Sequence, residues 1–272
     1  MKIMKKIAVA VFAGAMVFGF ASCGGAGDDP EGAIKGSGKN YSIDYTNEGT
    51  EVYRAYRDTA FKHAGACVQI DFLNVTEETK KAGVMGLIFD LVEKDGKKSF
   101  NVIGLRTANA NGDLEYYISR FENVTDIRAQ NFGAPEKGYE GNGATETPIK
   151  STWQPAKGNF DSTDKTVTVY PYAILKEVSK GKFQYECYLL KNKIKTLDSD
   201  GKPVDEDGNE VLLNSEESVK INTSYTELTQ TNFAVYANIY AKSDKKDAER
   251  CGTLQGKWTY RGDYKEVGVD ED

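Results

Sequence analysis

The chain has 272 residues, of which 39% are hydrophobic and 28% charged, and its formal net charge at pH 7 is −6. An acidic chain without a basic stripe lacks the surface that attracts nucleic acid, so we expect no nucleic-acid partner. His63 is the single histidine, which argues against a histidine-rich zinc site and leaves any Ser-His-Asp triad dependent on one residue. We therefore expect no cofactor, no metal and no catalytic triad.

The first 22 residues have the composition of an export signal. Lys2, Lys5 and Lys6 precede an apolar run over residues 7–21, and small residues stand at its end. This run is shorter than the roughly twenty apolar residues that a transmembrane helix needs. A transmembrane helix and an ordinary cleaved signal are the two alternatives to a lipoprotein signal peptide.

The end of this segment, Phe20-Ala21-Ser22-Cys23, resembles the lipobox of bacterial lipoproteins, in a relaxed form like that of spirochaetes. The resemblance implies cleavage before Cys23 and a lipid on its thiol. Two or three acyl chains anchor a protein stably, since each buried methylene contributes ~0.8 kcal/mol. Gly24 stands where a retention aspartate would be, so the resemblance also implies a location in the cell envelope, at the outer membrane.

Cleavage there would remove three lysines and no acids, which lowers the net charge to −9. Anionic lipid headgroups repel such a chain, so we expect the acyl chains on Cys23 to be its hold on the membrane. Residues 23–40 are rich in glycine and poor in large apolar groups, which predicts a flexible tether. Residues 41–272 are predicted to form one domain, a size that is ordinary for an all-β sandwich.

From Tyr41 onward the pattern is that of β-strands. Apolar segments bounded by turn residues are 66–75, 83–92, 99–106, 114–124, 166–175, 182–190, 232–241 and 253–261. Asp95-Gly96 and Asn111-Gly112 predict tight turns that join residues 83–124 into an antiparallel meander. Residues 51–62 are the one candidate helix, with an irregular segment as the equal alternative. Residues 131–158 are predicted to be a long surface loop. The predicted class is an all-β, two-sheet antiparallel β-sandwich.

Residues 83–124 resemble the central hairpins of concanavalin A-like jelly rolls. Their shared parts are a strand ending in Phe89-Asp90, a turn, a strand with an aromatic and an Asn, and a glycine turn before a tyrosine-rich strand. Residues 234–241 and 253–267 resemble the closing strands of lipoproteins with this fold. The resemblance implies a jelly roll with a concave sheet face, which in this family often binds glycans, although fold alone does not carry function.

Carbohydrate sites use flat aromatic rings beside polar groups that bind hydroxyls. Trp153, in a polar loop, is the best exposed candidate ring. We expect Tyr117 to line a polar concave surface together with Asn101, Arg106 and Arg120, which predicts a glycan or another host surface molecule as ligand. The alternative is that the sheet tyrosines pack against residues on neighbouring strands.

Two other interpretations depend on the acidic segment at residues 198–210. Residues 205–210 are the nearest match to the paired carboxylates of a glycanase, but the Asp-Gly turns there would direct carboxylates outward. As a calcium loop the segment fails at Lys202 and at Glu210, which stands where glycine belongs. We therefore expect a ligand-binding protein without enzymatic activity; a glycoside-active enzyme of this fold and a structural envelope protein are the alternatives.

The remaining cysteines, Cys67, Cys187 and Cys251, allow at most one internal disulfide in an oxidising compartment. Their positions do not rank the three possible pairings.

Overall fold

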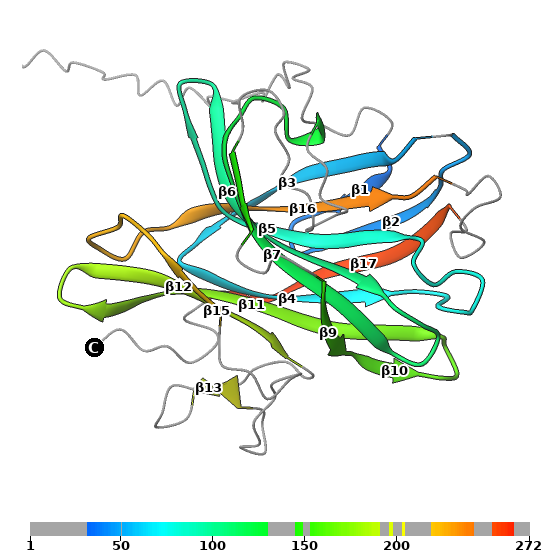
Figure 1. Cartoon of the computed structure of the whole chain (residues 1–272). Coiled ribbons are helices and arrows are strands. Elements are labelled where there is room, and N and C mark those ends of the chain that lie inside the picture. The colour runs from blue at the N-terminus through cyan, green and yellow to red at the C-terminus, as the bar shows by residue number, and fades with distance from the viewer. Residues whose placement is uncertain are drawn as a thin grey trace, which may run out of the picture.

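The structure is a computed structural model that describes residues 32–49, 51–129, 145–148, 153–190, 196–197, 203–204, 219–241 and 252–263. In this part of the chain two antiparallel sheets face each other as a β-sandwich (Figure 1). The prediction of an all-β, two-sheet sandwich of the jelly-roll class is confirmed. The signal segment, Cys23 and Cys251 lie outside the described residues.

The first sheet brings together strands from both ends of the chain, in the order β1-β2-β17-β4-β11-β12-β15, with β10 pairing with β11. Its strands are β1 (Ile34–Ser37), β2 (Asn40–Thr46), β4 (Gly65–Phe72), β10 (Asn159–Asp161), β11 (Thr166–Ser179), β12 (Lys182–Leu190), β15 (Val219–Asn222) and β17 (Thr253–Asp263).

The second sheet has the order β3-β16-β5-β6-β7-β8, with β9 pairing with β7. Its strands are β3 (Tyr53–His63), β5 (Gly83–Lys94), β6 (Lys97–Thr107), β7 (Asp113–Val124), β8 (Thr145–Pro148), β9 (Gln154–Lys157) and β16 (Thr231–Ile239). A short pair, β13 (Thr196–Leu197) with β14 (Pro203–Val204), and a 3-10 turn, η1 (Ile127–Ala129), complete the described elements.

The core lies between the sheets because alternate strand residues point inward. Met85, Leu87 and Phe89 of β5 pack in one cluster with residues of the first sheet such as Ile70 and Val169. Trp258 of β17 is also in this cluster, and its indole N–H donates a 3.1 Å hydrogen bond to the carbonyl oxygen of Gly86 on the opposite sheet. The sheets are thus joined by apolar packing and by a direct polar contact.

The outer face of the second sheet, turned away from the first sheet, carries a separate apolar cluster. It contains Tyr56, Val84, Ile88, Phe100, Val102, Tyr117, Phe121 and Tyr236 among others. This sheet is therefore covered on both faces, which accounts for the nearly continuous apolar sequence of β5.

The β5–β6 hairpin has the turn that the sequence predicts. Asp95 and Gly96 both have positive φ angles, 53° and 71°, as a type I′ turn requires. Gly112 in the next turn has φ 88°. Both hairpins of the meander predicted for residues 83–124 are present.

Three local predictions were wrong. The segment predicted as a helix, residues 51–62, lies almost entirely in strand β3 (Tyr53–His63), because this strand pairs with β16 and buries Ala55 and Tyr56. Ile34–Ser37 form β1 inside the segment predicted to be a tether, since Ile34 is fully buried and Gly36 and Gly38 supply positive φ for the turn into β2. Part of the predicted loop 131–158 forms β8 and β9, which pair with β7.

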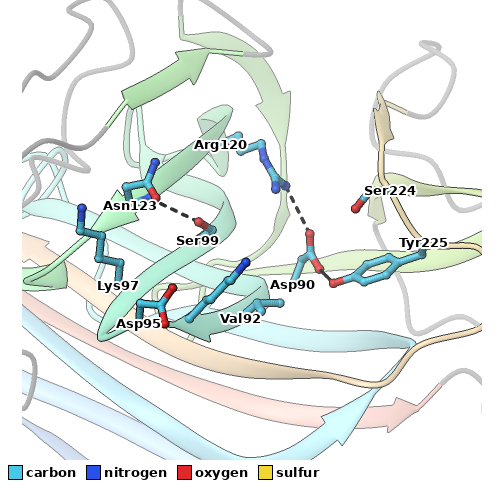
Figure 2. Close-up of a pocket in the computed structure, with 10 residues that line it drawn as sticks. Asp90, Val92, Asp95, Lys97, Ser99, Arg120, Asn123, Ser224 and Tyr225 are labelled. Carbon is cyan, nitrogen blue, oxygen red and sulfur yellow. Dashed lines mark hydrogen bonds and ion pairs between the residues drawn. The ribbon is translucent and has the colours of Figure 1, made fainter.

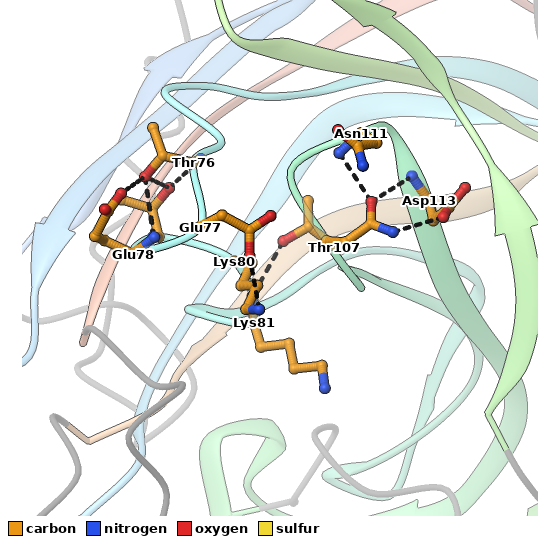
Figure 3. A network of polar contacts seen from close by, with 10 residues as sticks. Thr76, Glu77, Glu78, Lys80, Lys81, Thr107, Asn111 and Asp113 are labelled. Atoms are coloured by element: carbon orange, nitrogen blue, oxygen red, sulfur yellow. Dashed lines mark hydrogen bonds and ion pairs between the residues drawn. The ribbon is translucent and has the colours of Figure 1, made fainter.

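The segment between β4 and β5 crosses from one sheet to the other and is held by local polar contacts (Figure 3). Lys80 pairs with Glu77 at 2.8 Å, and the Thr76 hydroxyl donates to Glu78 at 2.7 Å. The backbone N–H of Lys81 donates to the Thr107 hydroxyl at 3.2 Å, which ties the crossing to β6. We assign this network a structural role.

Candidate functional site

A pocket of about 510 Å³ lies between the tip of the β5–β6 hairpin, strand β7 and the segment that follows β15 (Figure 2). Nine of its ten lining residues are polar or charged. The lining consists of Asp90, Val92, Lys94, Asp95, Lys97, Ser99, Arg120, Asn123, Ser224 and Tyr225. We call this the Asp90 pocket.

Two irregularities in the sheet shape the Asp90 pocket. Between Phe89 and Val92, β5 has one residue more than β6, and Asp90 in this bulge has φ 54°. Between Phe121 and Val124, β7 likewise has one residue more than β6, and Asn123 there has φ 58°. Bulges redirect side chains and are frequent beside functional sites, and after glycine Asp and Asn are among the residues that adopt positive φ most often.

Asp90 is the polar centre at the base of the pocket and is only 4% exposed. Its Oδ1 accepts a 2.7 Å hydrogen bond from the Tyr225 hydroxyl. Its Oδ2 accepts from Asn101 Nδ2 at 3.2 Å and from Arg120 Nη1 at 3.3 Å. Arg120 also donates through Nε to Glu122 at 2.8 Å. The four side chains Asp90, Asn101, Arg120 and Tyr225 thus form one hydrogen-bonded cluster, which we call the Asp90 cluster.

Burial raises the pKa of Asp90 above the ordinary 3.8, and it outweighs the hydrogen bond from Tyr225 and the charge of Arg120, which act in the opposite direction. The pKa of Tyr225 is also raised, by burial and by its hydrogen bond to the Asp90 carboxylate. A carboxyl group that keeps its proton to a higher pH than usual, next to a phenol, is a pair suited to proton transfer.

The mouth of the Asp90 pocket carries the charges of the hairpin tip. Lys94 and Lys97 face each other directly across the two strands, and Asp95 stands in the turn between them. The Ser99 hydroxyl accepts a 3.3 Å hydrogen bond from the backbone N–H of Asn123, which joins β6 to the bulge of β7. The pocket therefore offers charged groups at the mouth and hydrogen-bonding groups within.

The surface predicted from Tyr117, Asn101, Arg106 and Arg120 is divided between the two faces of the second sheet. Asn101 and Arg120 are directly paired residues of β6 and β7 and lie in the Asp90 cluster. Arg106 and Tyr117 lie on the outer face, because they differ from Asn101 and Arg120 by an odd number of positions along their strands. The prediction of one shared surface was wrong for this reason.

Trp153 joins Arg106 and Tyr117 on the outer face. The Arg106 guanidinium lies 4.0 Å from the centre of the Trp153 ring, and the Tyr117 ring meets that ring edge-on with 5.1 Å between centroids. Arg106 is also paired with Glu115 at 2.6 Å. Trp153 is thus a half-buried packing residue and not the exposed ring that the sequence predicts.

Tyr117 itself is 1% exposed, and its hydroxyl lies 3.1 Å from that of Tyr236. The rings of Tyr117 and Tyr236 occupy space that glycines leave open on the neighbouring strands, at Gly86 and Gly104. This matches the alternative in which the sheet tyrosines pack against residues on neighbouring strands.

A second pocket, of about 410 Å³, opens on the other side of the same hairpin. It is lined by Asp58, Thr59, Lys62, Leu91, Glu93, Lys98 and Asn232. Glu93 and Lys98 face each other directly across the strands, so opposite charges meet there. The Tyr56 hydroxyl donates to Asp58, which engages that carboxylate in the wall of the pocket.

Asp90 and Tyr225 are not among the site residues that the sequence predicts. The sequence does contain an indication for Asp90, because it is the one charged residue in the apolar segment 83–92. A buried carboxylate needs hydrogen-bonding or charged partners. The sequence contains no such indication for Tyr225, because it lies in a polar segment with no strand pattern and comes close to Asp90 only in the folded protein.

Within the described residues no group of three His, Cys, Asp or Glu side chains is placed to hold a metal ion. Cys67 and Cys187 are both buried. In the acidic segment 198–210 only Pro203 and Val204 are described, so both interpretations of that segment lie outside the described residues. No helix among the described residues is long and apolar enough to span a membrane.

No family model and no curated protein matches the chain. Among solved structures, the kappa-carrageenase of Zobellia galactanivorans is 9% identical with a TM-score of 0.40, over 85% of this chain and 80% of that one. The PL-14 alginate lyase of Aplysia kurodai is 10% identical with a TM-score of 0.35, over 84% and 85%. The carbohydrate-binding module CBM66 of Bacillus subtilis is 12% identical with a TM-score of 0.28, over 74% and 83%.

The prediction of a protein without enzymatic activity is contradicted, because other solved structures that match the chain are named as glycoside hydrolases or as an alginate lyase. At identities this low the likeness concerns the fold alone.

Proposed function

We propose that the protein is a carbohydrate-active β-sandwich that binds a saccharide in the Asp90 pocket. The observation that carries this proposal is the convergence of Asp90, Arg120 and Tyr225 from three separate segments on one open, polar pocket. Its volume, about 510 Å³, falls within the range of small-molecule sites, roughly 300–1,000 Å³.

The lining favours a ligand rich in hydroxyl groups. Apolar ligands need apolar walls, whereas this pocket has one aliphatic residue, Val92. Asp90 and Arg120 line the pocket, and their hydrogen bonds to each other and to the buried Asn101 hold them in fixed directions, which suits the alternating hydroxyls of a sugar ring. The Tyr225 ring adds an aromatic edge at the same place.

Binding is tested by screening an oligosaccharide array and measuring the best hit by calorimetry. We expect Asp90→Ala to lose at least tenfold in affinity, because Arg120 and Tyr225 lose the carboxylate that holds them in place at the pocket. Glu93→Gln is the matched control, since Glu93 stands on the same hairpin in the second pocket. Absence of any saccharide ligand, or equal binding by Asp90→Ala, would show the proposal to be wrong.

A second candidate function is acid–base chemistry on the bound saccharide. The raised pKa of Asp90 favours it, because buried carboxyl groups with raised pKa values act as proton donors and acceptors in active sites. The test is release of new reducing ends or unsaturated products from the saccharides that bind. We expect Asp90→Asn to lose product formation while it still binds, and product formation by this variant at the wild-type rate would exclude Asp90 as the acid or base.

We also propose that the protein is held in the cell envelope through lipid on Cys23, with residues before β1 as the link to the sandwich. The support is the sequence of residues 1–23, with its basic start, short apolar run and relaxed lipobox. Cys23→Ser should move the protein from the membrane fraction to the soluble fraction. Unchanged partitioning would contradict the anchor.

A further inference from the structure

We infer that the saccharide bound in the Asp90 pocket is anionic, with carboxylate or sulfate groups that Lys94 and Lys97 bind at the mouth. This inference rests on the proposed function and adds the class of ligand.

The first observation is the placement of the two lysines. Lys94 and Lys97 are directly opposed residues in the register of β5 and β6, at the last pair before the Asp95-Gly96 turn. Like charges directly opposite each other in an antiparallel pair destabilise it. Both residues line the Asp90 pocket, so the unfavourable pair stands at its mouth.

The second observation is that neither Lys94 nor Lys97 forms an ion pair with a carboxylate among the described residues. Two arginines of the second sheet are paired with carboxylates: Arg106 with Glu115, and Arg120 with Asp90 and Glu122. Neither Lys94 nor Lys97 has a described carboxylate within the 4.0 Å of an ion pair. Asp95 lines the same pocket and offsets one of the two positive charges.

The third observation is the contrast between the two faces of the hairpin. In the second pocket Glu93 stands directly opposite Lys98, so the charges there complement each other. In the Asp90 pocket the carboxylate of Asp90 is already bound by Arg120, Asn101 and Tyr225. Lys94 and Lys97 therefore face an incoming ligand with only Asp95 beside them, which leaves an excess of positive charge at the mouth of the pocket on a chain whose net charge is −6.

The experiment compares matched probes by calorimetry at low salt: a trisaccharide of galactose, the trisaccharide of galacturonic acid, and a sulfated galactose trisaccharide. We expect at least one acidic probe to bind about tenfold more tightly than the neutral one, and its affinity to fall as salt is added. The carboxylate and sulfate arms distinguish the two sources of negative charge.

The matched variants are Lys94→Gln with Lys97→Gln, and Lys98→Gln as the control on the opposite face. The double change should reduce affinity for the acidic probe about tenfold and leave the neutral probe unaffected, whereas the control should change neither. The salt dependence of the wild-type protein tests the inference even if a variant folds poorly.

Equal affinity for neutral and acidic trisaccharides would overturn the inference while the proposed function stands. No binding of any saccharide would remove the proposed function itself. Binding of oligoglutamate as tightly as the acidic sugar would show a site for anions in general and would overturn the assignment to a saccharide.

Discussion

The hydroxyl of Tyr225 donates a 2.7 Å hydrogen bond to Oδ1 of Asp90 across 135 positions of sequence. Asp90 belongs to β5 of the second sheet, whereas Tyr225 follows β15 at the edge of the first sheet. The Asp90 pocket therefore exists only where the two sheets have come together, and its chemistry is coupled to the stability of the sandwich.

The first prediction concerns pH. Because burial raises the pKa of Asp90, the folded protein holds this proton at pH values where the unfolded chain has released it. The free energy of unfolding should then fall as pH rises from about 3.8, the ordinary pKa, to the raised pKa of Asp90. Above the raised pKa, Asp90 should no longer change the free energy of unfolding with pH. Asp90→Asn should remove that part of the slope. Urea unfolding over a pH series measures it, and an unchanged slope would contradict the assignment.

The second prediction concerns Tyr225→Phe, which removes the hydroxyl and keeps the ring. We expect the free energy of unfolding to drop by about 1–3 kcal/mol, because a hydrogen bond to a carboxylate is lost. The pKa of Asp90 should rise further, since this hydrogen bond lowers it in the wild type. Tyr170→Phe is the control, a half-buried tyrosine on β11 away from the pocket. Equal effects of the two changes on urea unfolding would argue against the contact.

The third prediction concerns Gly104→Ala on the outer face of the second sheet. An added Cβ would overlap the ring of Tyr117 and contact the hydroxyl of Tyr236, both buried. Overpacking of this kind costs about 1–3 kcal/mol of the free energy of unfolding. Gly49→Ala, where the nearest atom is a side-chain oxygen 3.1 Å away, should be nearly neutral. Thermal unfolding separates them, and a neutral Gly104→Ala would contradict this packing.

The fourth prediction separates packing from binding. Trp153→Ala should lower the free energy of unfolding by about 1–3 kcal/mol, because the ring packs on Arg106 and Tyr117. Saccharide affinity should not change, since Trp153 lies on the face opposite the Asp90 cluster. Calorimetry on the folded variant checks this. Loss of affinity with unchanged stability would restore Trp153 as a ligand-binding residue.

The strands and tight turns of the second sheet were predictable because their signals are local. Asp95-Gly96 dictates the hairpin, and the apolar run of β5 is typical of a strand covered on both faces. The helix expected over residues 51–62 failed because pairing with β16 decides the conformation of that segment.

The candidate site was less predictable, because side-chain direction depends on register. Asn101 and Arg120 were found, but they were grouped with Tyr117 and Arg106, which the alternation of β6 and β7 places on the other face. The alternation of apolar and polar residues does not reveal where a bulge lies, so the face of the sheet on which the Asp90 side chain lies could not be predicted from the sequence. Tyr225 enters the site only through the packing of the two sheets.

The bulge at Asp90 also reverses which side chains of β5 lie on each face of the sheet in the residues that follow it. Before the bulge, odd-numbered residues of β5 such as Phe89 face the core; after it, even-numbered Val92 and Lys94 share that side, and Glu93 takes the other. Loss or gain of a single residue here would exchange the two sets of charges between the two pockets without altering the composition of the hairpin tip. Any relative of this chain with a one-residue gap at this position would therefore present the opposite electrostatic face to the same ligand.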